Sequence, residues 1–317
     1  CSCSSQGVTG GKGMKRGLTN AVAKICLALL LMLGAMPLFA QMDEFRERQQ
    51  NAFSGYKPIA MLIGAGELLP QEGAIGDLGL DETFGRQPVK VSFSVKYELL
   101  DHLDTGLYLG YTQIMFWDLF DPSSPFSELN YNPEFFWRFQ SGDNFLGDVS
   151  LPLIDYVQLG VEHKSNGQDE PLSRGWDRVY GQLQLALGVE PYIGFGLRSF
   201  ILFEDLVPRL NNWLGTSIIY PNEDNPDMIN YLGTLEANVI VDFGGLLPPF
   251  LPQRMLIQGA PRNALEGRIG LHWLQLDMFF FDMGGLRPVI QFYWGYGESL
   301  IEYNNASFAL RAGISLN

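Results

Sequence analysis

Hydrophobic and polar residues alternate in segments that recur from residue 57 to the end of the 317-residue chain. A period of two is typical of β-strands with one apolar and one polar face. No long, periodic and capped helix is predicted after residue 40. Turn-forming stretches such as DPSSP (121–125) separate the segments. The pattern predicts about twelve strands, at 57–64, 90–100, 107–117, 132–139, 155–165, 177–188, 192–203, 230–243, 254–258, 267–277, 288–297 and 307–316.

The composition favours a membrane barrel over a soluble sheet. The chain is 46% hydrophobic and 13% aromatic, and an outer-membrane barrel needs strands of about ten residues with an apolar outer face and aromatic residues near their ends. In strand 155–165, Val157, Leu159 and Val161 occupy odd positions, so odd positions should face lipid and even positions the lumen. We expect an all-β fold, a transmembrane antiparallel β-barrel of about twelve strands. A soluble β-sandwich is the alternative.

The N-terminal region has the features of an export signal. Two basic residues precede a short apolar run and then a group of small residues, which is how a secretory signal peptide is built. The apolar run is too short to span a bilayer, which takes about 20 residues. The expected division of the chain is an upstream extension at 1–13, a signal peptide at 14–40, a short N-terminal arm at 41–55 and the barrel domain at 56–317.

Charge and cysteine content exclude two further features. The net charge is −14, and removal of residues 1–40, which carry four basic residues, makes the chain more acidic. Such a chain is a poor ligand for nucleic acid or for anionic lipid surfaces. All three cysteines precede residue 41, so no disulfide is expected after export.

The stretch GVEHKSNGQDEPLSRGWDR (160–178) places polar residues in apolar rows. His163 and Ser165 continue the odd row of strand 155–165, and Asp177 begins the equivalent row of the next strand. Residues two apart on one face lie about 7 Å apart, and the turn brings the partner strand alongside. A serine nucleophile, a histidine base and an acceptor that fixes the imidazole tautomer are the groups needed for ester hydrolysis. Each alone could be a turn or surface residue, but polar groups that face lipid are costly and favour function.

The segment HKSNGQDEPLSRGWDR resembles the active-site signature of outer-membrane phospholipase A, a family of twelve-stranded barrels that hydrolyse phospholipid acyl esters. Residues 111–136, 222–233 and 293–304 also resemble that family, in the same order and spacing. The resemblance implies that His163 is the base and Ser165 the nucleophile. The third member is asparagine in the best-known form of the family, where this sequence has Asp177.

The resemblance also implies a need for calcium. A hard cation with oxygen ligands can stabilise the oxyanion that forms when serine adds to an ester, and the backbone amide of Gly167 is expected to be a second donor to that oxygen. Gln168 replaces the family's usual arginine, but a carbonyl ligand survives that change. The implied ligands are the Gln168 carbonyl, the Ser173 hydroxyl and Ser123 of the partner subunit, with Glu170 and Asp224 matching an alternative calcium site of the inactive monomer.

A site that needs a ligand from each subunit is active as a homodimer. Gln113 supports a dimer independently, because it interrupts the apolar row that includes Leu109 and Met115. An amide that faces lipid is costly, and pairing it across an interface offsets the cost. A locally reversed register is the alternative. His102 and His272 have no identified partner and are interpreted as structural.

Together these features predict a calcium-dependent phospholipase of the A1/A2 and lysophospholipase type in the outer membrane of a Gram-negative bacterium, acting on outer-leaflet phospholipid as a dimer. The alternative from another class is a barrel without catalysis, a porin or transporter that keeps a relict motif. An esterase acting on other lipids is a further alternative. About twelve strands leave little lumen for a porin.

Overall fold

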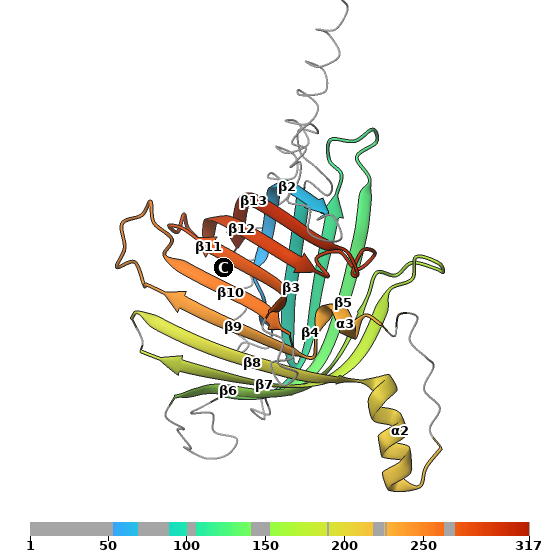
Figure 1. Cartoon of the computed structure of the whole chain (residues 1–317). Helices are drawn as coiled ribbons and strands as arrows, with labels where there is room; N and C mark the ends of the chain where they lie inside the picture. Colours follow the sequence, from blue (N-terminus) through green and yellow to red (C-terminus); the bar gives the residue numbers. More distant parts are fainter. Residues whose placement is uncertain are drawn as a thin grey trace, which may run out of the picture.

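The computed structural model describes residues 53–68, 89–99, 106–140, 153–188, 190–217, 225, 227–262 and 270–316. Twelve antiparallel strands form a closed barrel, in which each strand pairs with its sequence neighbours and β2 closes on β13 (Figure 1). The strands are β2 (Ile59–Leu68), β3 (Val89–Leu99), β4 (Leu107–Trp117), β5 (Phe126–Gln140), β6 (Ile154–Ser165), β7 (Gly175–Leu187), β8 (Tyr192–Leu202), β9 (Leu235–Asp242), β10 (Arg254–Pro261), β11 (Leu271–Phe279), β12 (Leu286–Tyr296) and β13 (Ala306–Leu316). The predicted all-β barrel is confirmed, and the β-sandwich alternative is wrong.

Two strands at the N-terminal end of the barrel pair with different parts of β3. The short strand β1 (Phe53–Gly55) pairs with the Val95–Tyr97 part of β3, and β2 pairs with the Val89–Ser92 part. The strand predicted at 57–64 corresponds to β2, which begins two residues later, and β1 precedes it as a short strand that was not predicted. The predicted upstream extension, the signal peptide and most of the N-terminal arm lie outside the described residues.

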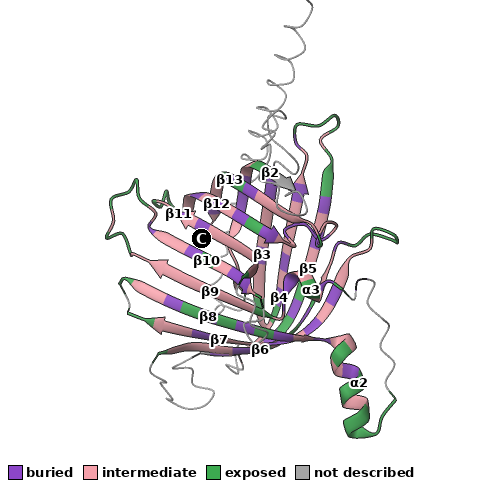
Figure 2. Cartoon of the chain, in the orientation of Figure 1, coloured by how far each residue is buried: buried purple, intermediate pink, exposed green. Residues whose placement is uncertain are grey.

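The two faces of the wall follow the predicted register. Along β8, buried residues alternate with exposed ones (Figure 2). The outer face of β8 carries Phe195 and Leu197, which are 43% and 53% exposed, whereas its inner face carries the buried Arg198. Such alternation of apolar outside and polar inside is that of a transmembrane barrel.

A hydrophobic cluster fills part of the interior behind the β6–β7 hairpin. Inward-facing residues of β5, β7 and β8 meet residues from the segments that follow β8 and β12. The buried members are Phe136, Trp176, Tyr180, Phe200, Leu202, Met228, Leu232, Leu300 and Tyr303. Close packing of these side chains supports the hairpin from inside the barrel.

The helix α2 (Phe203–Leu214), which begins directly after β8, was not predicted from the sequence. Two features hide it in the sequence: no side chain caps its N-terminus, and Pro208 lies inside it. Gly215 ends the helix in the left-handed conformation, where glycine is favoured. No helix in the described part of the chain is long and apolar enough to cross a membrane.

The strand predicted at 230–243 is also corrected. Residues Ile229–Leu232 form the short helix α3, and β9 begins only at Leu235. Gly233 separates the two with a φ of 75°, a conformation that breaks both helix and strand. The segment 246–262, whose structure the sequence leaves open, contains a loop followed by β10 (Arg254–Pro261).

Candidate active site

The β6–β7 hairpin brings together the three residues singled out in the sequence. His163 lies directly opposite Asp177 in the strand register, and Ser165 lies opposite Gly175. The Nδ1 atom of His163 is 2.8 Å from Oδ1 of Asp177, and its Nε2 atom is 3.0 Å from Oγ of Ser165. The imidazole thus bridges a hydroxyl and a carboxylate, the arrangement in which a serine can be activated as a nucleophile.

This relay lies on the outer face of the barrel. His163 and Ser165 continue the row of Leu159 and Val161, which are 53% and 37% exposed. The side chains of His163 and Asp177 are 47% and 34% exposed. The relay is therefore open to the surroundings of the barrel wall, and the imidazole is not buried in the pore.

The turn that follows Ser165 is held by Asn166, which is buried. Its Nδ2 donates to the carbonyl of Leu172, and its Oδ1 accepts hydrogen bonds from the backbone amides of Gln168 and Arg174. A side chain that satisfies three backbone groups of one turn fixes the shape of that turn. The backbone next to Ser165 is consequently held in one conformation.

Gly167 adopts a positive φ of 64° within this turn. A Cβ atom at this position would lie 3.0 Å from the ring of Tyr131, which pairs with Ser165 across β5 and β6. Glycine is therefore required both by the backbone conformation and by the close approach of the ring. Its amide, two residues after Ser165, is the predicted oxyanion donor.

The predicted calcium ligands divide between two turns. Gln168 and Glu170 are exposed and Ser173 is half-buried in the β6–β7 turn, whereas Ser123 is exposed in the β4–β5 turn with a φ of 68°. Asp224 lies outside the described residues. No group of three or more histidine, cysteine, aspartate or glutamate residues suited to a metal occurs in the part of the chain that the structure describes.

Gln113 lies in the outward-facing row of β4. The pairing of β4 with β3 and β5 is continuous on both sides of this residue, so the alternative of a locally reversed register is wrong. Leu109 in the same row is 48% exposed. The hydroxyl of Tyr111 donates to Oε1 of Gln113 at 3.1 Å. Among the other histidines, His272 lies in β11 beside Gly233, and His102 lies outside the described residues.

The residues that hold the relay from inside were not predicted from the sequence. Asn132 donates through Nδ2 to Oε1 of Glu162 at 2.5 Å and to the backbone carbonyl of His163 at 3.0 Å. Glu162 also accepts a hydrogen bond from Nε of Arg178, and these two residues are the immediate neighbours of His163 and Asp177 in the chain. The same alternation that places the relay outside places this pair inside, and that signal was available in the sequence.

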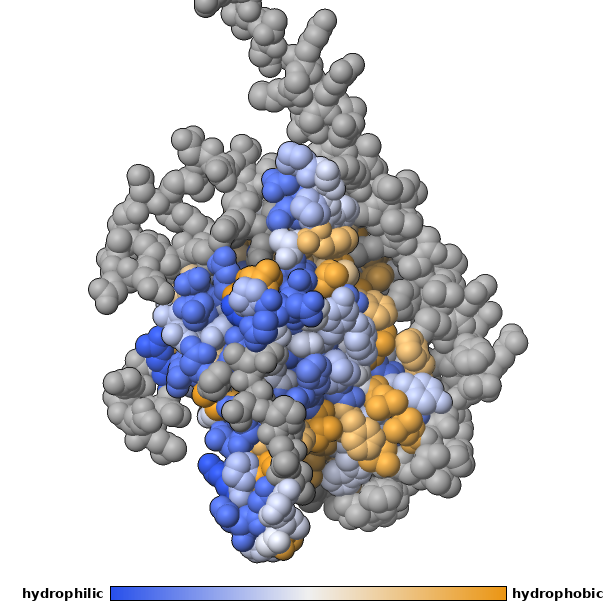
Figure 3. Space-filling view, turned by 90° about the vertical axis from the view of Figure 1, so that its right-hand side faces the viewer, coloured by the Kyte–Doolittle hydropathy of each residue, from blue (hydrophilic) through white to orange (hydrophobic). Residues whose placement is uncertain are grey.

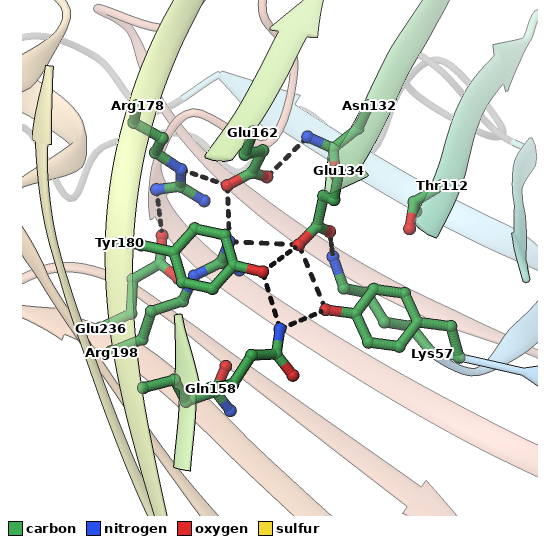
Figure 4. Close-up of polar contacts among 12 residues, drawn as sticks. Lys57, Thr112, Asn132, Glu134, Gln158, Glu162, Arg178, Tyr180, Arg198 and Glu236 are labelled. Carbon is green, nitrogen blue, oxygen red and sulfur yellow. Dashed lines mark hydrogen bonds and ion pairs between the residues drawn. The ribbon is translucent and has the colours of Figure 1, made fainter. Parts of the chain in front are cut away.

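A wider ionic network surrounds this pair (Figure 4). Arg198 bridges Glu162 and Glu134 at 2.7 and 3.3 Å, and Lys57 contacts Glu134 at 2.5 Å. Arg178 also pairs with Glu236 at 2.8 Å. Because buried charges are tolerated only when they are paired and hydrogen-bonded, removal of one member would leave the others uncompensated.

Comparison with known proteins identifies the family. A family model described as Phospholipase A1 matches residues 39–316. Phospholipase A1 of Escherichia coli (strain K12) is 26% identical over 249 residues, which make up 77% of this chain and 74% of that protein. A putative phospholipase A1 of Neisseria meningitidis serogroup B is 26% identical over 253 residues, covering 75% of this chain and 57% of the relative.

Solved structures support the fold. Outer membrane phospholipase A from Escherichia coli matches with a TM-score of 0.61 at 24% identity, over 84% of this chain and 98% of that chain. The Salmonella typhi outer membrane phospholipase, solved as a dimer with bound calcium, matches with a TM-score of 0.62 at 24% identity, over 85% and 93%. A family match over most of the chain, together with the same barrel, shows that this chain belongs to the phospholipase A1 family of outer-membrane hydrolases.

Proposed function

We propose that this chain is a calcium-dependent phospholipase of the A1/A2 and lysophospholipase type, with Ser165, His163 and Asp177 as its catalytic residues. The observation that carries the proposal is the hydrogen-bonded relay from Asp177 through His163 to Ser165 on the outer wall. A site on that wall meets the acyl esters of membrane phospholipid without extracting the lipid from the bilayer. The interior holds an ionic network and an aromatic cluster, which give no support to a porin.

The geometry suggests a two-step reaction. Nε2 of His163 accepts the proton of Ser165 as Oγ attacks the acyl carbonyl carbon, and Oδ1 of Asp177 holds the protonated Nδ1. The tetrahedral intermediate collapses when His163 returns the proton to the departing lipid alcohol, which leaves an acyl ester on Ser165. Water then attacks the acyl carbon while His163 takes one of its protons, and His163 returns that proton to Ser165 Oγ as the bond to the fatty acid breaks. The amide of Gly167 donates to the oxyanion in both steps.

The oxygen donors of the β6–β7 turn fit a calcium ion. The Gln168 carbonyl and the Ser173 hydroxyl are hard oxygen ligands in the turn next to the relay, and calcium takes six to eight such ligands together with water. The Glu170 carboxylate, in the same turn, is proposed for the alternative calcium site of the monomer. When bound, the cation would supply positive charge close to the developing oxyanion. Donors from one turn are too few to complete a coordination shell, which supports a role for Ser123 of the partner subunit.

Activity in the dimer follows from this shared site. Gln113 on the outer face of β4 is proposed to pair with the partner subunit through its Nε2 group, because both polar atoms of an amide that faces lipid need partners and Tyr111 bonds to Oε1. The relative from Salmonella typhi was solved as a dimer with bound calcium, which supports the same assembly here. A lipase that is active only as a dimer can be switched by association within the membrane.

The test measures fatty acid released from mixed micelles of phospholipid and detergent. The wild-type protein is assayed with calcium and with EDTA, beside Ser165→Ala and Ser199→Ala, where Ser199 is an exposed serine on the outer face of β8. We expect activity only in the wild type and Ser199→Ala with calcium. Equal release by the wild type with calcium, by the wild type with EDTA and by Ser165→Ala would overturn the proposal.

A further inference from the structure

Helix α2 (Phe203–Leu214) carries a continuous apolar stripe. Apolar residues recur at intervals of three and four, which places them on one face of a helix. The opposite face holds charged and amide residues, among them Glu204, Asp205, Arg209 and Asn212. The members of the stripe are Phe203, Leu206, Val207, Leu210, Trp213 and Leu214.

The stripe is partly buried in the N-terminal half of α2 and exposed in its last turn. Val207 is buried, and the helix packs against β7 and β8. In the last turn, Trp213 is 79% and Leu214 55% exposed. Figure 1 shows α2 turning away from the direction of β8 and leaving the barrel wall, so the tip reaches beyond the wall.

The stripe starts beside the relay. Leu202, the last residue of β8, pairs with Arg178, so Phe203, the first residue of α2, follows at the level of Asp177. Phe195 and Leu197 on the outer face of β8 are exposed apolar residues of the same wall. The stripe therefore continues the lipid-facing surface of the barrel at the level of the catalytic residues.

The two faces of α2 suit the surface of a membrane. In the space-filling view, where α2 forms the lowest part of the molecule, the surface that it turns to the viewer is mostly hydrophilic, with apolar atoms at its lower tip (Figure 3). A helix with one apolar and one polar face lies in the plane of the interface, with its apolar face at the boundary between headgroups and acyl chains. Tryptophan favours that boundary because its ring is apolar and its N–H is polar.

We propose that α2 docks on the phospholipid leaflet beside the active site, with the stripe seated at the acyl boundary. The barrel already anchors the protein, so the helix acts locally, by bringing the edge of the lipid layer to Ser165. The acidic residues of its polar face favour a zwitterionic over an anionic leaflet. The proposed dimer surface on β4 and helix α2 lie on opposite sides of the relay. The relay is on β6 and β7, β4 is separated from β6 by β5, and α2 follows β8, which pairs with β7. The proposal rests on the proposed function for its substrate but not for the docking itself.

Lipid quenching tests the docking without catalysis. Ser165→Ala protein is reconstituted in phosphatidylcholine vesicles with bromine at shallow or at deep acyl positions. The Trp213 signal is taken as the difference between this protein and the same protein with Trp213→Phe. We expect stronger quenching by shallow bromine than by deep bromine, and protection from acrylamide. Full quenching of Trp213 by acrylamide would overturn the proposal. Shielding of Trp213 from bromine that increases with protein density in the vesicles would also overturn it, because it would show that the stripe binds a second copy of the chain.

Kinetics separate docking from chemistry. We expect Trp213→Asn with Leu214→Asn to lower kcat/KM on phosphatidylcholine vesicles by about three- to tenfold, since interfacial binding scales with the apolar area buried. Hydrolysis of a water-soluble short-chain ester should be unchanged. The matched control, Arg209→Gln with Asn212→Ser, changes the polar face and should retain both rates. Equal losses on both substrates, or no loss on vesicles, would refute the role of α2, whereas a wild type inactive on both would refute the proposed function alone.

Discussion

Replacement of Asp177 by asparagine tests what the third member of the relay contributes. The carboxylate has two functions: it accepts the hydrogen bond of the His163 Nδ1–H, and its charge stabilises the imidazolium that forms when Ser165 attacks. Asparagine keeps an acceptor oxygen of the same shape but has no charge. Asp177→Asn therefore removes one function and leaves the other.

The structure sets the size of the expected effect. Two unit charges about 4 Å apart interact by about 4 kcal/mol at an effective dielectric constant of about 20 and by about 1 kcal/mol in water. The His163 and Asp177 side chains are 47% and 34% exposed, and hydrolysis of the acyl ester requires water at the site, so water partly screens the pair and the lower half of that range applies. A loss of about 1 to 2 kcal/mol corresponds to a reduction in kcat of about five- to thirtyfold.

The assay is calcium-dependent fatty acid release from phospholipid micelles at saturating substrate, so that kcat is measured. Asp177→Ala is the matched comparison: it removes both the acceptor and the charge, and we expect a larger loss than with asparagine. An activity loss of more than about a hundredfold in Asp177→Asn would refute the reasoning. It would mean that the amide locks His163 in the wrong tautomer, as can occur where a relay is rigidly enclosed.

Three further changes test other parts of the structure. Glu162→Leu removes the buried carboxylate that Arg178 and Arg198 share, and should lower the free energy of unfolding by about 3 to 5 kcal/mol. A change below about 1 kcal/mol in urea unfolding, followed by tryptophan fluorescence, would contradict this prediction. Gly167→Ala places a Cβ atom 3.0 Å from the Tyr131 ring on a backbone in the left-handed conformation. It should reduce kcat by about ten- to hundredfold with little change in KM, and an unchanged kcat would contradict this prediction. Gln113→Leu should weaken dimerisation by about three- to thirtyfold in analytical ultracentrifugation with calcium, and an unchanged dimer constant would remove this residue from the interface.

The sequence predicts the barrel because its signal is local. A strand with one face in lipid must alternate, and the register of strand 155–165 follows from Leu159 and Val161 alone. The same count places His163 and Ser165 on the outer face, where the structure has them. The hydrogen bonds of the relay could not be derived from that count, because they depend on the pairing of His163 with Asp177 across a turn whose length does not by itself fix the register.

The helix α2 was not predicted because its determinants lie in tertiary structure. Its first residue, Phe203, reads as a continuation of the strand before it, and Pro208 argues against a helix. Packing of the buried Val207 on the barrel overrides both signals. Short helices gain most of their stability from such packing of an amphipathic face rather than from propensity.

The alternation also explains how an exposed relay can be held in place. Active sites are usually rigid because protein surrounds them, but the outer wall of a barrel has lipid on one side. Here Glu162 and Arg178, the neighbours of His163 and Asp177, form an ion pair on the inner side of the same two strands. Any shift of β6 against β7 that breaks the relay must also break this buried pair, which is costly. The strand period of two thus places a rigid ionic brace directly behind the catalytic residues.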